Sequence, residues 1–195
     1  MVTIVLVRHA AHDDLGRILS GRSDVALNSR GAEQADRLAR RLLVDRPVEI
    51  HASPRRRTRQ TAQAIASHAQ MEVKIMDNLD EIDFGAWTGA SFAQLASDPR
   101  WDAWNARRST ASAPEGESMA SAVARAVEHC ERHRGDTDEA ILCVTHGDII
   151  RGTVAHYLGL SLDGIHGFDV EPASITRLRL TRQNTCLLTM NEVPS

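Results

Sequence analysis

The hydrophobic and polar positions of this chain follow two periods, which alternate along its length. The first apolar run, residues 3–7, is unbroken and rich in β-branched side chains. Such a run predicts a strand at the centre of a sheet that is covered on both faces. Apolar residues then recur at helical spacing up to Leu42, and either Asn28 or Ser29 suits the N-cap of that helix.

The same succession of strand and helix continues to the end of the chain. Ser53 is expected to cap a helix that has Pro54 at its first position, because the missing N–H of proline costs nothing there. Further helices are expected around residues 119–133 and from about 148 to 158, and further strands at 48–52, 72–76, 140–144, 173–180 and 185–191. This order predicts an α/β fold, a three-layer α/β/α sandwich with a mostly parallel central sheet. We expect one domain over residues 1–195.

Composition narrows the class of protein without naming a function. The 195 residues, of which 42% are hydrophobic and 25% charged, are typical of one domain with a full core. The net formal charge of −3 gives no reason to expect nucleic-acid binding. Cys130, Cys143 and Cys186 form neither a CxxC pair nor a disulfide framework, which fits a reducing cytoplasm. No apolar stretch suits a membrane span or a signal peptide, so we expect a cytoplasmic protein without membrane contact.

Candidate chemistry lies at the ends of two predicted strands. His9 follows the strand at residues 3–7, and His146 follows the strand at 140–144. Ligands of open α/β sheets bind at the carboxyl ends of the strands, so both histidines can reach one crevice. A single histidine at such a place is more often a loop residue or a packed core group. Two matched occurrences favour a functional site.

Arg8 indicates the kind of ligand. A guanidinium at the end of a buried strand is costly unless it meets an anion. An arginine beside a histidine therefore indicates phosphate, whereas a cation such as Zn²⁺ would be repelled. A rival hypothesis is a metal-dependent hydrolase built on His9, His12, Asp13 and His146, although this spacing fits no familiar metal motif.

Five sequence blocks follow one another in a familiar order: "LVRHA", "SPRRRTRQTA", "LDEIDFGAWTG", "PEGES" and "VTHGDIIRG". Together they resemble the histidine phosphatase superfamily, in the branch related to cofactor-dependent phosphoglycerate mutase. The resemblance extends from Thr3 to about Leu160 and more loosely to the end. It implies phosphoryl transfer through a phosphohistidine, with a small phosphorylated metabolite as substrate and with neither a cofactor nor a metal ion.

Carried over residue by residue, the resemblance implies a complete site. It consists of the nucleophile His9, its phosphate-binding neighbours Arg8 and Arg57, the second histidine His146, the proton donor Glu81, and the substrate-loop residues Ser20 and Gly21. The charge pattern by itself does not separate Arg57 from Arg55, Arg56 and Arg59, nor Glu81 from Asp80 and Asp83. Phe84 and Trp87 are expected to enclose the carboxyl group or to belong to the core, and the core is the expected place of Trp87.

Elementary chemistry agrees with the implied roles. Neutral imidazole attacks phosphorus in line, and donors around the equatorial oxygens stabilise the transition state. Gly147 and the first amides of the following helix would add backbone donors. We therefore predict a metal-independent phosphomonoesterase of the histidine acid phosphatase type. The alternatives are a phosphoglycerate mutase-type phosphotransferase and, in another class, a non-catalytic module that binds phosphorylated ligands through Arg8 and Arg57.

Two further features bear on specificity. The family's Arg-His-Gly-Glu motif is replaced here by Arg8-His9-Ala10-Ala11-His12, so the substrate cannot be inferred from the family. His12, Asp13 and Asp14 are expected at the rim of the pocket, against a substrate hydroxyl or water. The segment between Trp87 and Pro114 is short, which leaves little cover to exclude water and favours hydrolysis over transfer.

The remaining histidines show no pattern, and Cys143, inside an apolar strand, is expected to pack as a small hydrophobe. These histidines are His51, His68, His129, His133, His156 and His166.

Overall fold

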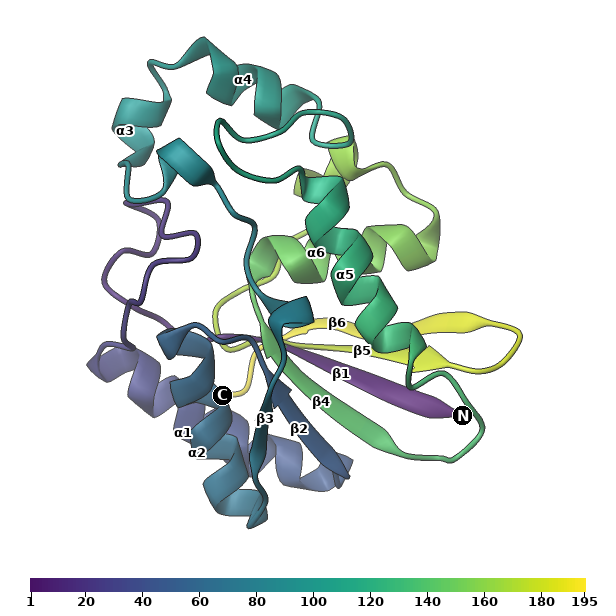
Figure 1. Ribbon diagram of the computed structural model, residues 1–195. Coiled ribbons are helices and arrows are strands. Elements are labelled where there is room, and N and C mark those ends of the chain that lie inside the picture. The colour runs from purple at the N-terminus through teal and green to yellow at the C-terminus, as the bar shows by residue number, and fades with distance from the viewer.

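The computed structural model describes residues 1–195 and is built around a six-stranded sheet with the order β3-β2-β4-β1-β5-β6 (Figure 1). The neighbours β3, β2, β4 and β1 run parallel, while β5 is antiparallel to β1 and β6 is antiparallel to β5. The prediction of a mostly parallel sheet is therefore confirmed. The strands are β1 (Val2–Arg8), β2 (Glu49–Ala52), β3 (Val73–Ile75), β4 (Ala140–Thr145), β5 (Ile175–Leu180) and β6 (Thr185–Glu192).

Helices cover both faces of this sheet and complete the predicted three layers. The helices α1 and α2 pack on one face, α5 and α6 pack on the other, and the short α3 and α4 extend beyond the sheet (Figure 1). Their bounds are α1 (Ser29–Leu42), α2 (Arg56–Ala69), α3 (Phe92–Leu95), α4 (Pro99–Ala106), α5 (Met119–Glu131) and α6 (Gly147–Leu158). None of these helices is long and apolar enough to span a membrane.

The alternation of side chains along β1 explains its unbroken apolar run. Val5 and Val7 belong to the core beneath α1 and α2, whereas Ile4 and Leu6 belong to the core on the side of α5 and α6. A strand covered on both faces has no position at which a polar side chain meets water. The predicted cap of α1 is also confirmed, because the Asn28 side chain accepts a hydrogen bond from the Gly31 amide.

The predicted start of the second helix is wrong. The helix α2 begins at Arg56, its N-cap residue is Arg55, and no side chain caps it. Ser53 lies three residues before the helix, and its hydroxyl is hydrogen-bonded to His146 Nε2 at 2.8 Å and to Asp80 Oδ1 at 3.2 Å. The Ser53 hydroxyl, which the local sequence predicts to cap the helix, therefore forms tertiary hydrogen bonds to His146 and Asp80.

Three adjacent strands bring the candidate chemistry to one edge of the sheet. In the register of the sheet, Arg8 of β1 pairs with Thr145 of β4, and Ala52 of β2 pairs with Val144 of β4. The three strands run parallel, so their carboxyl ends lie side by side. The residues that follow these ends are His9, His146 and Ser53.

Candidate active site

A pocket of about 390 Å³ opens at this edge of the sheet. Seven of the sequence-predicted site residues line it: Arg8, His9, Ser20, Gly21, Arg57, Glu81 and Gly147. The eighth, His146, is fully buried and contacts Arg57 from behind. The structure therefore brings together every side chain that the motifs had placed in the site.

His9 is held as a neutral imidazole. Only 3% of the residue is exposed, and its Nδ1 lies 2.9 Å from the Ala10 carbonyl oxygen, to which it donates. Burial, together with the guanidiniums of Arg57 and Arg8, lowers the pKa of His9 well below its ordinary value of 6.5. With the proton on Nδ1, the lone pair of Nε2 accepts from Arg57 Nε at 3.3 Å. This lone pair therefore lies beside the Arg57 guanidinium, in the pocket that His9 lines.

Arg57 is the arginine that the fold selects from the basic run at the start of α2. It is 1% exposed, while Arg56 and Arg59 are exposed. Its guanidinium donates to the Gly21 carbonyl at 2.6 Å and to the Ser23 carbonyl at 3.0 Å, and it contacts both histidines. The helix turns only one arginine of the run inward, and this one joins the loop at residues 21–23 to the two imidazoles.

His146 is oriented by a chain of hydrogen bonds that runs away from the pocket. Ser53 donates its single proton to Asp80, so it accepts a hydrogen bond from His146 Nε2. The lone pair of His146 Nδ1 then accepts from Arg57 Nη2 at 3.1 Å. Burial and the same guanidinium lower the pKa of His146 well below 6.5, so the ring is neutral in the free site. Ser53 is a positioning residue that sequence reasoning interpreted as a helix cap.

Arg8 and Gly147 lie against one another. A side chain on Gly147 would bring its Cβ to 3.3 Å from Arg8 Nε, so glycine leaves space for the guanidinium at the start of α6. Arg8 donates one hydrogen bond to the Val170 carbonyl, and its buried Nε has no partner. An unpaired buried donor beside a helix N-terminus suits an anion.

Glu81 is distinguished from its acidic neighbours by its surroundings. Burial and the nearby Asp148 carboxylate raise the pKa of Glu81 to about 7. Asp80 accepts from Ser53, and Asp83 lies outside the pocket, 3.4 Å from the Arg22 guanidinium. Glu81 Oε2 lies 3.6 Å from His146 Nδ1. Of the neighbouring carboxyl groups at positions 80, 81 and 83, only that of Glu81 lines the pocket. Its raised pKa allows it to carry a proton near neutral pH.

The "PEGES" block holds this carboxyl group in place. Glu117 accepts hydrogen bonds at 2.9 Å from Arg22 and from Arg125, and both arginines donate to the Glu81 carbonyl oxygen. Gly85 has a left-handed φ of +49°, and a Cβ there would collide with the Pro114 carbonyl oxygen. Close backbone contact and a half-buried charge network therefore fix the segment that carries Glu81.

The predicted rim is only partly correct. His12 is buried and lines the pocket, with its ring centroid 5.2 Å from that of His9, so it belongs inside the site. Burial and the Arg57 charge lower the pKa of His12 to about 4. Asp13 is exposed and accepts from Asn28, while Asp14 accepts from Ser20 at 3.3 Å. Local sequence could not separate His12 from its acidic neighbours, because the turn that follows it directs the three side chains differently.

The outer wall of the pocket comes from residues that the sequence did not single out. The segment between Trp87 and Pro114 is short, yet it forms α3 and α4, and residues of these helices line the outer wall of the pocket. Arg108 is buried and donates to Asp148 at 2.9 Å, and Arg151 lies 3.3 Å from the same carboxylate. Nothing local separates Arg108 from Arg107. The other wall residues are Phe92, Trp101, Asn105 and His166. Phe84 also lines the pocket, whereas Trp87 is core, as expected.

Comparison with known proteins identifies the family. The model of the histidine phosphatase superfamily (branch 1) matches residues 4–193. Phosphoserine phosphatase 1 of Hydrogenobacter thermophilus is 30% identical over 196 residues, which cover 98% of this chain and 92% of the relative. The chain belongs to the histidine phosphatase superfamily, and the resemblance seen in its motifs is confirmed.

Solved structures agree with this assignment. Bacillus stearothermophilus YhfR superposes with a TM-score of 0.89 at 25% identity, covering 99% of this chain and 98% of that one. The phosphoserine phosphatase of Entamoeba histolytica, in complex with 3-phosphoglyceric acid, gives a TM-score of 0.83 at 26% identity and covers 98% of each chain.

Proposed function

We propose that this protein hydrolyses small phosphomonoesters through a phosphohistidine formed on His9 Nε2. The observation that carries the proposal is a buried, neutral imidazole whose unprotonated Nε2 lies beside the Arg57 guanidinium, inside a pocket that Arg8 also lines. Such a nitrogen is a nucleophile at neutral pH, and the guanidiniums supply donors for the phosphoryl oxygens.

The first half-reaction replaces a P–O bond by a P–N bond. The lone pair of His9 Nε2 attacks phosphorus while the bond to the alcohol oxygen breaks, and protonated Glu81 gives its proton to that oxygen. Arg8, Arg57 and the amides at the start of α6, from Gly147 onward, stabilise the equatorial oxygens. The bound dianion also raises the pKa of His146, whose Nδ1 can then donate to the phosphoryl group as well.

The second half-reaction returns the enzyme to its starting state. Glu81, now a carboxylate, takes a proton from water, and the water oxygen attacks phosphorus as the P–N bond breaks. Inorganic phosphate leaves and His9 is neutral again. The pKa of about 7 suits Glu81 to both roles, because acid and base forms are both accessible near neutral pH.

The pocket favours a substrate with a second negative group. Four guanidiniums line it, those of Arg8, Arg57, Arg108 and Arg151, against the carboxyl groups of Glu81 and Asp148. When Glu81 carries its proton, the four guanidiniums and the Asp148 carboxylate leave three positive charges, of which a phosphate dianion balances two. Arg108 Nε is also buried without a partner. We therefore propose a phosphorylated metabolite that also carries a carboxylate, directed toward Arg108 and Arg151. The names of the relatives, a phosphoserine phosphatase among them, point in the same direction.

The geometry favours chemistry without a metal ion at this site. The rival metal set requires Asp13 beside His9, yet Asp13 is exposed, bonds Asn28 and does not line the pocket. A cation would also meet the guanidiniums of Arg8 and Arg57, which repel it.

A phosphatase screen tests the proposal. Phosphate release from carboxylated and uncarboxylated monoesters is measured in the presence and absence of EDTA, at a temperature at which the protein stays folded. We expect turnover that is indifferent to the chelator and highest kcat/KM for the carboxylated substrates. Loss of turnover in EDTA, restored by zinc or manganese, would support the metal-dependent hydrolase. Phosphate binding without turnover would support a binding module, and transfer to added 3-phosphoglycerate faster than phosphate release would support a mutase.

The Glu81→Gln variant tests the proton donor. For alkyl phosphates we expect kcat/KM to fall by about 10² to 10⁴-fold, because the leaving alkoxide receives no proton. For p-nitrophenyl phosphate the loss is smaller, since p-nitrophenolate is a stable leaving group. In the parent protein kcat/KM for alkyl substrates declines as pH rises through about 7, where Glu81 loses its proton, and the variant lacks this decline.

Asp83→Asn is the matched control, because it removes a neighbouring carboxylate that lies outside the pocket. An equal loss in both variants, or a Glu81→Gln protein that keeps the decline at high pH, would assign the proton to another group.

A further inference from the structure

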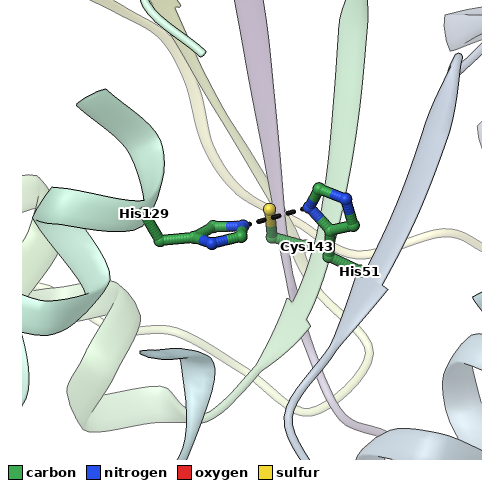
Figure 2. Close-up of side chains that lie close together, drawn as sticks. All are labelled: His51, His129 and Cys143. Atoms are coloured by element: carbon green, nitrogen blue, oxygen red, sulfur yellow. Dashed lines mark hydrogen bonds between the residues drawn. The ribbon is translucent and has the colours of Figure 1, made fainter. Parts of the chain in front are cut away.

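A second cluster of chemically reactive side chains lies away from the pocket, beneath α5. Figure 2 shows His51 of β2, His129 of α5 and Cys143 of β4 pointing toward one another. They are 1%, 2% and 0% exposed, and none of them lines the active-site pocket. His51 and Cys143 face each other in the register of β2 and β4. Three elements distant in sequence thus place two imidazoles and a thiol in one buried cluster.

The donor atoms of the cluster converge. One ligand atom from each residue lies within 4.8 Å of the other two. His51 Nδ1 and His129 Nε2 are 3.0 Å apart (Figure 2). Two nitrogens bound to one tetrahedral Zn²⁺, each about 2.0–2.1 Å from the metal, are separated by roughly 3.3 Å. The observed spacing therefore needs only a small opening to accept an ion between the rings.

Glu49 sets the orientation of the His51 ring. Glu49 Oε2 lies 2.6 Å from His51 Nε2, and a hydrogen bond from the Lys74 ammonium helps to hold the pKa of Glu49 below its ordinary value. The carboxylate accepts the Nε2 proton, so the lone pair of Nδ1 points at His129. A carboxylate on the outer nitrogen of a ligating histidine is the usual second shell of a protein metal site.

A fourth donor stands at the edge of the cluster. The ring of His133, directly after α5, is centred 5.3 Å from that of His51 and 5.4 Å from that of His129. His133 is partly exposed, so an ion can reach the buried cluster from solvent past this ring.

We propose that His51 Nδ1, His129 Nε2 and Cys143 Sγ bind one thiophilic divalent cation of the zinc type. The ion would connect β2, β4 and α5 and stabilise the fold. The donor set of two imidazoles and one thiolate is one that zinc prefers.

Binding requires a defined movement of protons. In the free protein His129 Nε2 donates to His51 Nδ1, and burial raises the pKa of the Cys143 thiol, so the sulfur carries its proton. When the ion enters, the thiol proton is released to solvent, and the His129 proton is exchanged from Nε2 to Nδ1. The net change is one proton released for each ion bound.

Cobalt titration of the metal-stripped protein tests the site, because thiolate ligation of Co²⁺ gives a near-ultraviolet charge-transfer band. We expect the band to saturate at one Co²⁺ per chain and to disappear on addition of Zn²⁺. Cys143→Ala should lose the band. Cys186→Ser should keep it, because Cys186 is exposed on β6 outside the cluster. A parent protein without the band, or a Cys143→Ala protein that keeps it, would overturn the proposal.

Thermal unfolding gives an independent measurement, because the effect of Zn²⁺ is first observed on the parent protein and does not require the Cys143→Ala variant to fold. Zn²⁺ should raise the melting temperature of the parent protein in a concentration-dependent manner, and this shift should be absent in His129→Gln. His9→Ala should keep the full shift, since it alters only the active-site pocket. No shift in the parent protein, or an undiminished shift in His129→Gln, would show that the cluster is a hydrogen-bonded core pair with no metal affinity.

Discussion

Replacing His9 by alanine is expected to lower kcat/KM for phosphomonoesters by at least about 10⁴-fold, the scale on which removal of a covalent nucleophile acts. The ring is buried, neutral and held by the Ala10 carbonyl, so no other atom of the pocket occupies its place. The melting temperature should change little by comparison, because His9 lines the pocket and belongs to none of the three apolar core clusters. Phosphate release from a panel of monoesters, measured alongside thermal unfolding, gives both quantities.

Chemical trapping separates this result from a general loss of binding. Rapid acid-free quenching of the parent protein with radiolabelled substrate should yield a protein-bound phosphate that is stable in base and labile in acid, and His9→Ala should yield none. His12→Ala is the matched control, because His12 lies in the same pocket with its ring centroid 5.2 Å from that of His9. A His12→Ala protein without the phosphoenzyme, or a His9→Ala protein with it, would move the nucleophile to His12.

Arg57→Met is expected to lower kcat/KM by about 10³-fold or more, as does the loss of an arginine that stabilises a phosphoryl-transfer transition state. Two effects combine in this variant. The phosphoryl oxygens lose a donor, and the Gly21 and Ser23 carbonyls lose the guanidinium that holds the substrate loop. We expect kcat and KM both to be impaired, as measured by steady-state kinetics on a monoester that the parent protein hydrolyses.

Two further variants define what Arg57 contributes. Arg57→Lys keeps the charge but cannot make the same forked set of hydrogen bonds, so most of the loss should persist. Arg56→Met removes an adjacent, exposed arginine and should leave kcat/KM unchanged. Full activity in Arg57→Lys would mean that only the positive charge of Arg57 matters. A comparable loss in Arg56→Met would mean that the arginines of the run act through their summed charge and not through specific hydrogen bonds.

The sequence pattern predicted most of the strands and helices, because the buried face of each element requires apolar residues at the period of a strand or a helix. The unbroken run at the start of the chain predicted a strand covered on both faces, and the structure places it as β1 in the centre of the sheet. The two histidines could be placed at one edge from strand direction alone. The roles of Arg57 and Glu81 were different, because neither charge pattern nor local spacing separates them from their neighbours, and only the family resemblance selected them.

The errors have a common physical origin. Ser53 has the residue type and position of a helix cap, yet its hydroxyl bonds to His146, which lies 93 positions away in the chain. Arg108 belongs to a run with Arg107 and turns inward only because Asp148 is there to accept its charge. His51 and His129 looked scattered until the sheet and α5 placed them 3.0 Å apart.

The sequence by itself determined the alternation of strands and helices, the layers that result and the edge of the sheet at which His9 and His146 emerge. These features follow from local periodicity and chain direction, which every short segment carries in itself. Only the tertiary structure decided which arginine turns inward, which carboxyl group keeps a proton near neutral pH, and that two histidines and a cysteine meet beneath α5. Those properties depend on burial and on charges contributed by distant segments, and neither exists until the chain has folded.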